Sequence, residues 1–93
     1  MAHIKLHLLN IFRLKINKPF VEYEGKTVGD IINQFVAEYK NKLDEGLLSK
    51  NRKKLHPQIV VLLNGRNVAQ KGKLKTKLAD GEDLYVSVPI TGG

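Results

Sequence analysis

Hydrophobic residues recur at every second position near both ends of the chain. In residues 4–8 they are Ile4, Leu6 and Leu8, and residues 84–88 repeat the pattern with Leu, Val and Val. Because successive side chains of a β-strand point to opposite faces of its sheet, each set would cover a single face. This two-residue period predicts the first and the last strand of the protein.

The segment after the first strand has a weaker pattern. Phe12, Leu14 and Ile16 also alternate with polar residues, so they either continue the first strand or form a partly buried connection. The Asn-Lys-Pro sequence at 17–19 then interrupts the alternation. Residues 20–23 (Phe-Val-Glu-Tyr) are typical of a second strand, and proline suits the position just before it.

The strongest pattern in the chain has the period of an α-helix. Thr27 is a good N-cap residue, and Asp30 three positions later completes a capping-box-like pair at the positive end of the helix. Gly46 is the expected end of this helical region. The hydrophobic positions that follow the cap form one stripe: Val28, Ile31, Ile32, Phe35, Val36, Tyr39 and Leu43.

A second apolar strand is predicted at residues 59–63, because five consecutive aliphatic residues precede an Asn-Gly turn at 64–65. This strand is hydrophobic on both faces. One face should pack on the helix, and the other is covered by the protein itself or by a partner. Residues 67–69 are a candidate short strand, and the alternating lysines of 71–77 predict a charged loop or sheet edge.

The order of these elements is strand, strand, helix, strand, short strand, strand. One helix lying across a mixed sheet of four or five strands is the simplest way to bury their hydrophobic faces. The sequence therefore predicts an α+β fold of the β-grasp (ubiquitin-like) type. We expect residues 1–93 to form a single domain, with residues 89–93 as an extended, flexible C-terminal tail.

Composition narrows the classes of function. The chain has 93 residues, a net charge of +7 and no cysteine, which excludes a disulfide scaffold and a thiol nucleophile. Its three histidines are dispersed, so no metal site is expected. No apolar run approaches the roughly 20 residues of a membrane span, and a cytoplasmic location is the simplest expectation. The excess of Lys and Arg over Asp and Glu favours an acidic partner, either a nucleic acid or an acidic protein surface.

The sequence ends in Gly92-Gly93, directly after Val-Pro-Ile-Thr at 88–91. Glycines carry no side chain that would clash in a narrow channel. A carboxylate that is itself a substrate would need such a slender approach to the active site of another protein.

The chain resembles the ubiquitin-like sulfur carriers, and is most similar to the small subunit of molybdopterin synthase. The similarity is specific in residues 78–93, where an Asp-Gly turn and an apolar strand precede a proline, a threonine and Gly-Gly. Val61–Gly65 and the Thr-Val pair at 27–28 also match that family's pattern. The chain departs from the family's pattern at two places. The family commonly has two prolines before the tail, whereas this chain has only Pro89 there. Segment 50–54 of this chain is also more basic than is usual in the family.

The resemblance implies a carrier without catalysis of its own. A ubiquitin-activating-type adenylating enzyme would use ATP to activate the Gly93 carboxylate, which would become a thiocarboxylate and donate its sulfur. The large subunit of molybdopterin synthase is the implied recipient, and the carrier itself binds no cofactor. Four residues would form the part of the tail that enters the partner's active site: Pro89, Ile90, Thr91 and Gly92.

Two other readings stay open at this stage. A related carrier or modifier would use the same Gly93 chemistry for tRNA thiolation or protein conjugation. A basic β-grasp module that binds RNA is the third reading, and it is less favoured because aromatic residues for base stacking are scarce near the basic segment. The residues of that candidate basic patch are Lys50, Arg52, Lys53 and Lys54.

Overall fold

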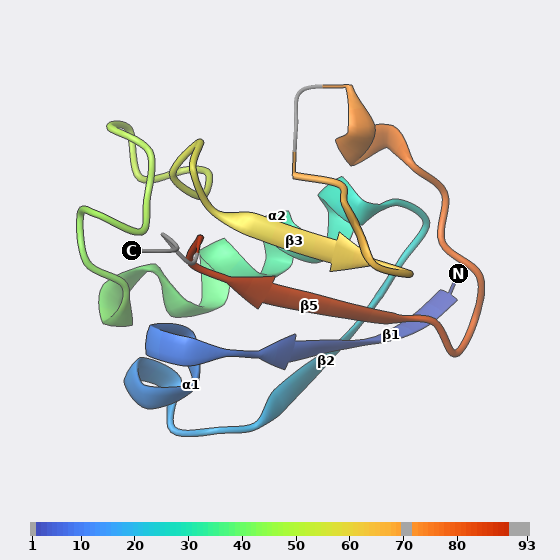
Figure 1. Ribbon diagram of the computed structural model, residues 1–93, viewed down its shortest axis with the longest axis horizontal. Helices are drawn as coiled ribbons and strands as arrows, with labels where there is room; N and C mark the ends of the chain where they lie inside the picture. Colours follow the sequence, from blue (N-terminus) through green and yellow to red (C-terminus); the bar gives the residue numbers. More distant parts are fainter. Residues whose placement is uncertain (1, 70–71, 90–93) are drawn as a thin grey trace.

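The computed structural model describes residues 2–69 and 72–89. In these residues a mixed five-stranded sheet is covered on one face by a single long helix (Figure 1). The strands and helices are β1 (Ala2–Leu8), α1 (Asn10–Ile16), β2 (Phe20–Gly25), α2 (Val28–Tyr39), β3 (Val60–Leu63), β4 (Arg66–Asn67) and β5 (Asp83–Ser87), with 3₁₀ turns at Lys40–Lys42 and Lys73–Lys75. This is the β-grasp arrangement expected from the sequence.

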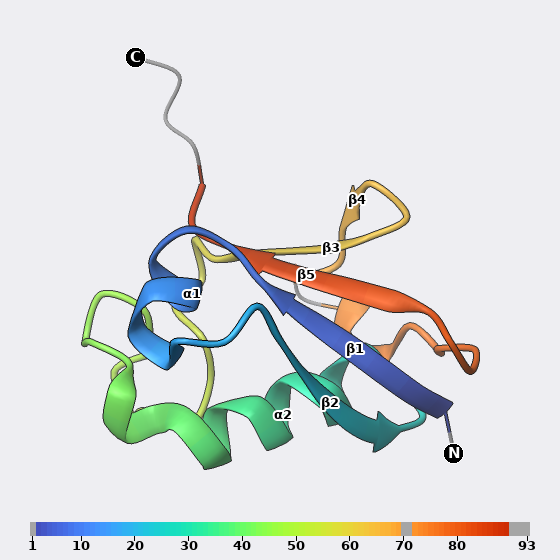
Figure 2. The same cartoon turned by 90° about the horizontal axis from the view of Figure 1, so that it is seen from below.

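The strand order is β2-β1-β5-β3-β4, so the last strand lies in the middle of the sheet. β1 and β5 pair in parallel, and β5 pairs with β3 in the antiparallel direction. A parallel pair needs a long crossover connection, and α2 supplies it by crossing one face of the sheet (Figure 2). Because β5 has a hydrogen-bonded neighbour on each side, the end of the chain leaves the fold from a central strand.

The inner face of the sheet and one side of α2 form the core. Leu6 pairs with Val21 on one side and with Leu84 on the other, and the side chains of Leu6 and Leu84 are fully buried. From the helix, Ile31 and Phe35 are also completely buried. The two-residue period of the strands and the stripe of the helix therefore meet as predicted.

The capping box at the start of α2 is present as predicted. The Asp30 N–H donates to Thr27 Oγ1 (3.2 Å), and Asp30 Oδ2 accepts from the backbone N–H groups of Lys26 (2.9 Å) and Thr27 (3.1 Å). These backbone donors hold the pKa of Asp30 below its ordinary value. The pair fixes the point at which the chain leaves β2 and enters the helix.

The helix ends earlier than predicted. α2 stops at Tyr39 and tightens into the 3₁₀ turn 40–42, so Gly46 is not its end. Leu43 still belongs to the core, with 3% of its surface exposed, because the tighter turn returns it to the apolar side.

Residues 10–16 do not continue the first strand; they form the partly buried connection between β1 and β2, and its helical form was not predicted. Phe12 and Ile16 are buried and lie four positions apart, the spacing of one helical face, whereas Leu14 is 77% exposed. Asn17 ends α1 in the left-handed conformation (φ 62°), and its N–H donates to the carbonyl of Arg13 (2.8 Å). Asparagine tolerates this conformation, which makes it a helix-ending signal that the strand pattern concealed.

We predict that Thr27→Ala lowers the free energy of unfolding by about 1 kcal/mol, because it removes the hydroxyl that caps α2. Thr27→Ser keeps the hydroxyl and should be nearly neutral. Urea unfolding at neutral pH compares the two, and equal losses would contradict the assigned role of the cap.

Asp30 should make stability depend on pH in acid. Because its pKa is lower in the folded state, its carboxylate stabilises the fold fully above the ordinary value of 3.8, and this contribution disappears as the pH falls through the lowered pKa. The difference in stability between the wild type and Asp30→Ala should therefore shrink as the pH is lowered through that window. Urea titrations over this range would show it, and a constant difference would contradict it.

Candidate functional site

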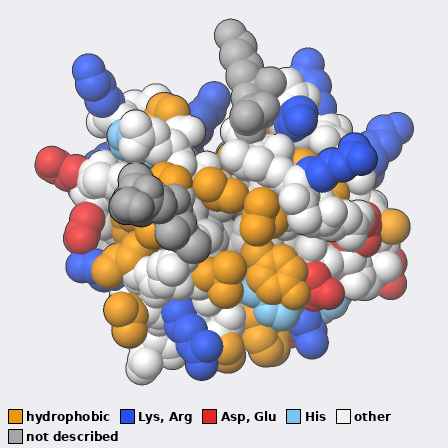
Figure 3. All heavy atoms as spheres, viewed as in Figure 1, with side chains coloured by type: hydrophobic (Ala, Val, Ile, Leu, Met, Phe, Trp, Pro, Cys, Tyr) orange, Lys and Arg blue, Asp and Glu red, His pale blue; other side chains and the backbone are white. Residues whose placement is uncertain are grey.

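The sheet face opposite α2 carries a row of apolar and aromatic side chains. The strand register places Phe20, His7, Tyr85 and Leu62 side by side on β2, β1, β5 and β3. Tyr85 is 38% exposed, and neighbouring Leu9 is 36% exposed. Figure 3 shows hydrophobic side chains gathered near the centre of this face, with charged side chains towards its margins. We call Phe20, His7, Tyr85 and Leu62 the outer row.

Direct ring contacts connect three members of the outer row, Phe20, His7 and Tyr85. The His7 ring stacks on Tyr85, with centroids 4.4 Å apart, and lies 5.8 Å from the Phe20 ring. Lys5 Nζ sits 4.8 Å from the centre of the Phe20 ring. Such stacked and cation–π contacts hold the side chains in fixed positions, so the row presents a preformed surface.

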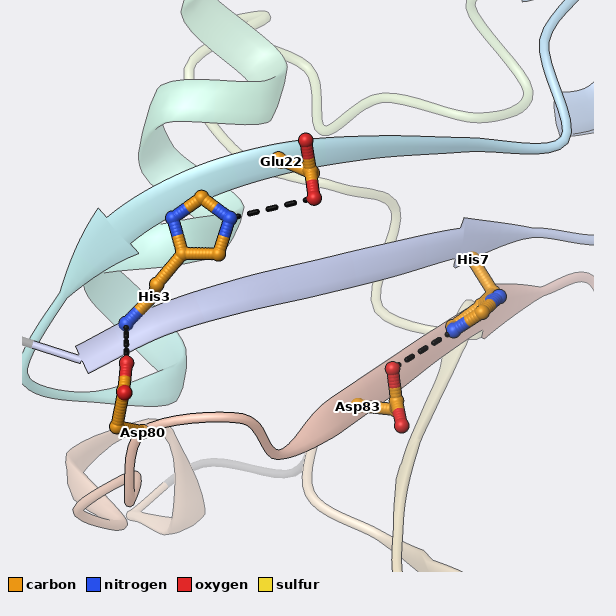
Figure 4. Close-up of polar contacts among 5 residues, drawn as sticks. All are labelled: His3, His7, Glu22, Asp80 and Asp83. Carbon is orange, nitrogen blue, oxygen red and sulfur yellow. Dashed lines mark hydrogen bonds and ion pairs between the residues drawn. The ribbon is translucent and has the colours of Figure 1, made fainter.

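Polar contacts on this face fix the two histidines of β1 (Figure 4). His7 Nε2–H donates to Asp83 Oδ1 (2.9 Å), and His3 Nε2–H donates to Glu22 Oε1 (3.2 Å). The His3 backbone N–H also donates to Asp80 Oδ1 (2.7 Å). Each of these two histidines is thus paired with one carboxylate, and among the described residues no hydrogen bond links either pair to a nucleophilic side chain. The geometry suits binding more than acid–base catalysis.

The described part of the chain also contains neither a candidate metal site nor a candidate membrane-spanning helix. Residues 2–69 and 72–89 contain no cluster of three metal-ligating side chains. Within those residues, no helix has the length and hydrophobicity needed to cross a bilayer. The third histidine, His56, accepts a hydrogen bond at Nδ1 from the Gln58 N–H (3.1 Å), which is a structural role in a turn.

The end of β5 is braced by the turn that begins α1. Ser87 is 8% exposed, and its hydroxyl is shared between Asn10 Oδ1 and the carbonyl of Val88 (2.8 Å). The Leu9 N–H donates to the carbonyl of Val86 (3.0 Å). Asn10 itself has a positive φ of 53°, which asparagine tolerates better than most residues. These contacts fix the position from which residues 88 and 89 leave the sheet.

The predicted tail is described only at its first residue. Pro89 is exposed and follows half-buried Val88. The other predicted tail residues, Ile90, Thr91, Gly92 and the reacting Gly93, lie outside the described residues.

The candidate basic patch forms one ordered, exposed turn. The backbone N–H of Lys53 donates to Asn51 Oδ1 (2.9 Å), and that of Lys54 donates to Ser49 Oγ (3.2 Å). Arg52 Nη2 donates to the carbonyl of Lys40 (2.9 Å), which ties the turn to the end of α2. Lys50, Arg52, Lys53 and Lys54 are all exposed.

Sequence reasoning did not identify the outer row. Phe20, His7 and Tyr85 lie in the polar phase of their strands, where for example Tyr85 alternates with buried Leu84 and Val86. An aromatic residue in that phase was the available signal. The strand at 59–63 was expected to pack one face on the helix and to have its other face covered by the protein or by a partner. Val61 and Leu63 do pack inwards, whereas Val60 and Leu62 stay half-buried on the outer face.

Comparison with known proteins identifies the family. The model of the ThiS family matches residues 10–93. The chain belongs to the ThiS family. Small archaeal modifier protein 3 of Haloferax volcanii is 35% identical to it over 97% of this chain and 98% of that protein. The sulfur carrier protein CysO of Mycobacterium tuberculosis is 27% identical over 78% of each chain.

Solved structures agree with this assignment. The small archaeal modifier protein 1 of Methanosarcina acetivorans superposes on this ThiS-family chain with a TM-score of 0.80 at 26% identity, covering 100% of this chain and 98% of that one. A chain of the BexX/CysO complex of Amycolatopsis orientalis gives a TM-score of 0.67 at 28% identity, covering 97% and 99%. The ThiS-family chain is therefore a ubiquitin-like protein of the carrier and modifier type.

Two neighbouring residues of β3 test which face of the sheet is structural. Val61→Ala should lower the free energy of unfolding by about 2 kcal/mol, because it opens a cavity beneath α2. Leu62→Ala removes more atoms but should cost less, about 1 kcal/mol or below, because Leu62 is only partly buried. Urea unfolding of both variants measures the difference, and a larger loss for Leu62→Ala would show that the outer face is part of the core.

Proposed function

We propose that this protein is a sulfur carrier whose reactive group is the carboxylate of Gly93. The observation that carries the proposal is the family match over residues 10–93, which includes the Gly-Gly end. Sequence relatives named as a sulfur carrier and as a modifier protein support it. The braced end of β5 fits this role, since it gives the tail a fixed point of departure.

The chemistry requires activation, because a carboxylate is a poor electrophile. An oxygen of the Gly93 carboxylate attacks the α-phosphorus of ATP and pyrophosphate leaves, giving an acyl-adenylate. Hydrosulfide then attacks the carbonyl carbon and AMP leaves, giving the thiocarboxylate. An adenylating enzyme of the ubiquitin-activating type provides the catalytic groups and binds the ATP. The carrier is a co-substrate in this scheme, and it acts in the cytoplasm, where ATP is available.

The outer row is the surface that we assign to this partner. It is apolar, partly exposed and preformed, and its aromatic members are of the kind enriched at protein interfaces. The BexX/CysO complex supports the idea that a protein of this type forms a complex with a second protein. Hydrophobic docking on the outer row would hold the carrier while its tail enters the active site.

The recipient that we propose is the large subunit of molybdopterin synthase, on the resemblance of residues 78–93 to the small subunit of that enzyme. Protein conjugation is the second candidate, and it is favoured by the 35% identical relative that is named a modifier protein. Both use the same activated Gly93. They differ in whether sulfide or a lysine amine attacks the activated carbonyl.

Intact-protein mass spectrometry tests the carrier role. With an adenylating enzyme, ATP and hydrosulfide, the chain should gain the mass of one oxygen-to-sulfur exchange, located on Gly93. Deletion of Gly92-Gly93 should abolish the gain and leave the unfolding curve unchanged. An unmodified wild-type chain beside an enzyme that modifies its own carrier would overturn the proposal. Adding the synthase large subunit or a mixture of cell proteins then separates sulfur transfer from conjugation.

Substitution in the outer row should weaken docking without changing the chemical step. We expect Tyr85→Ala to raise the KM for the carrier in adenylation about tenfold or more, with kcat within about twofold of the wild type. Asn33→Ala, an exposed position on α2, is the control and should leave both constants unchanged. If Tyr85→Ala reduced kcat alone, the outer row would not be the docking surface.

A further inference from the structure

The net charge of the protein is concentrated in two connecting segments. Residues 10–19 and 40–58 contain nine of the 16 Lys and Arg residues but only two of the nine acidic residues, Asp44 and Glu45. The excess of seven positive charges in these two segments equals the net charge of the whole chain. The basic and acidic side chains of all the other residues are therefore equal in number. We call the nine residues the basic collar: Arg13, Lys15, Lys18, Lys40, Lys42, Lys50, Arg52, Lys53 and Lys54.

The topology brings these segments together at one end of the molecule. β1 and β5 are parallel and finish at the same end, and β3 starts there because Val60 pairs with Ser87. α2 also finishes there, as both views of the ribbon show (Figures 1 and 2). Segments 10–19 and 40–58 therefore lie around the point where residues 88 and 89 leave the sheet. The sequence alone showed only one of them, the basic patch.

The collar is held in place by contacts that leave its charges exposed. All nine side chains are exposed, and among the described residues only Lys15 has an acidic ion-pair partner, Asp44 (2.9 Å). That pair connects α1 to the second segment, and Arg52 connects the second segment to the end of α2 through the carbonyl of Lys40. Buried Leu47 and Leu48 anchor the same segment in the core. The charges are thus arranged before any partner binds, which lowers the entropy lost on binding.

The chemistry of the collar favours an acidic protein over a nucleic acid. Leu14 is 77% exposed between Arg13 and Lys15, and an apolar side chain within a charged surface fits the buried centre of a protein interface. Two aromatic residues are adjacent in sequence to the collar. Phe12 is fully buried, and Tyr39 is half-buried and packs against Phe35 (5.6 Å between centroids), so neither ring is free to stack on a base.

We propose that the basic collar docks on an acidic rim around the entrance of the partner's active site and steers the tail into it. The inference rests on the proposed function, since it concerns the same tail and the same partner. Complementary charge mainly raises the rate of association, and ordinary salt screens it over about 8 Å. The molecule is 33 Å long, so charges at its far end act almost independently of the collar.

Matched charge reversals at the two ends test the proposal in the adenylation assay. The collar variant carries Lys50→Glu, Lys53→Glu and Lys54→Glu. The control variant carries Lys73→Glu, Lys75→Glu and Lys77→Glu, the same change in net charge at the far end. At physiological salt the collar variant should lose about tenfold or more in kcat/KM with kcat unchanged, and the control should lose about twofold or less. The gap should narrow as sodium chloride is added.

Each outcome decides the question. Equal losses in the two variants, beside an active wild type, would overturn the collar and leave the carrier role intact. An inactive wild type would overturn the proposed function and the collar with it. If the collar variant kept its kcat/KM but lost salt-sensitive binding to labelled single-stranded RNA, the collar would belong to a nucleic acid and the proposal would be wrong. Lys-to-Gln changes at positions 50, 53 and 54 give an intermediate loss and guard against misfolding of the Glu variant.

Discussion

The parallel pairing of β1 with β5 is the constraint on which the rest of the structure depends. It places the last strand between β1 and β3, with hydrogen bonds on both sides. Parallel pairing also requires a connection that crosses one face of the sheet, and α2 forms this crossover. With a single crossover helix, only one face can be covered by the protein. The outer row stays partly exposed for that reason.

The same pairing decides what surrounds the tail. Since β1, β5 and α2 all finish at one end, their connections must gather there, whatever their composition. Basic residues in those connections therefore form one surface, although they lie about 30 positions apart in the sequence. The outer row reaches this end through Leu9, which precedes α1 and hydrogen-bonds to β5. Apolar contact and positive charge thus border the same point of exit.

The sequence predicted the elements whose pattern and caps agree. α2 combines a stripe of buried positions with a complete capping box, and both are local signals. It did not reveal that the connection at α1 is helical, because Phe12 and Ile16 satisfy a two-residue and a four-residue period alike. The site was harder to predict, because side chains from four strands make the outer row. Strand order and register make those side chains neighbours, and the local sequence pattern predicts neither. The basic patch could be found from the sequence because its residues lie within one short segment.

The reach of the tail explains why docking surface and reactive group must be close. A fully extended chain spans at most roughly 3.5 Å per residue, so the six residues 88–93 could carry a carboxylate about 21 Å beyond β5. A partner that receives Gly93 in a buried active site must then approach the end of β5 itself. Surfaces near Ser87 therefore face the partner when the tail is bound. Tyr85 is two residues away on the same strand, and the collar surrounds the exit, so the fold places both where a partner holding the tail would meet them.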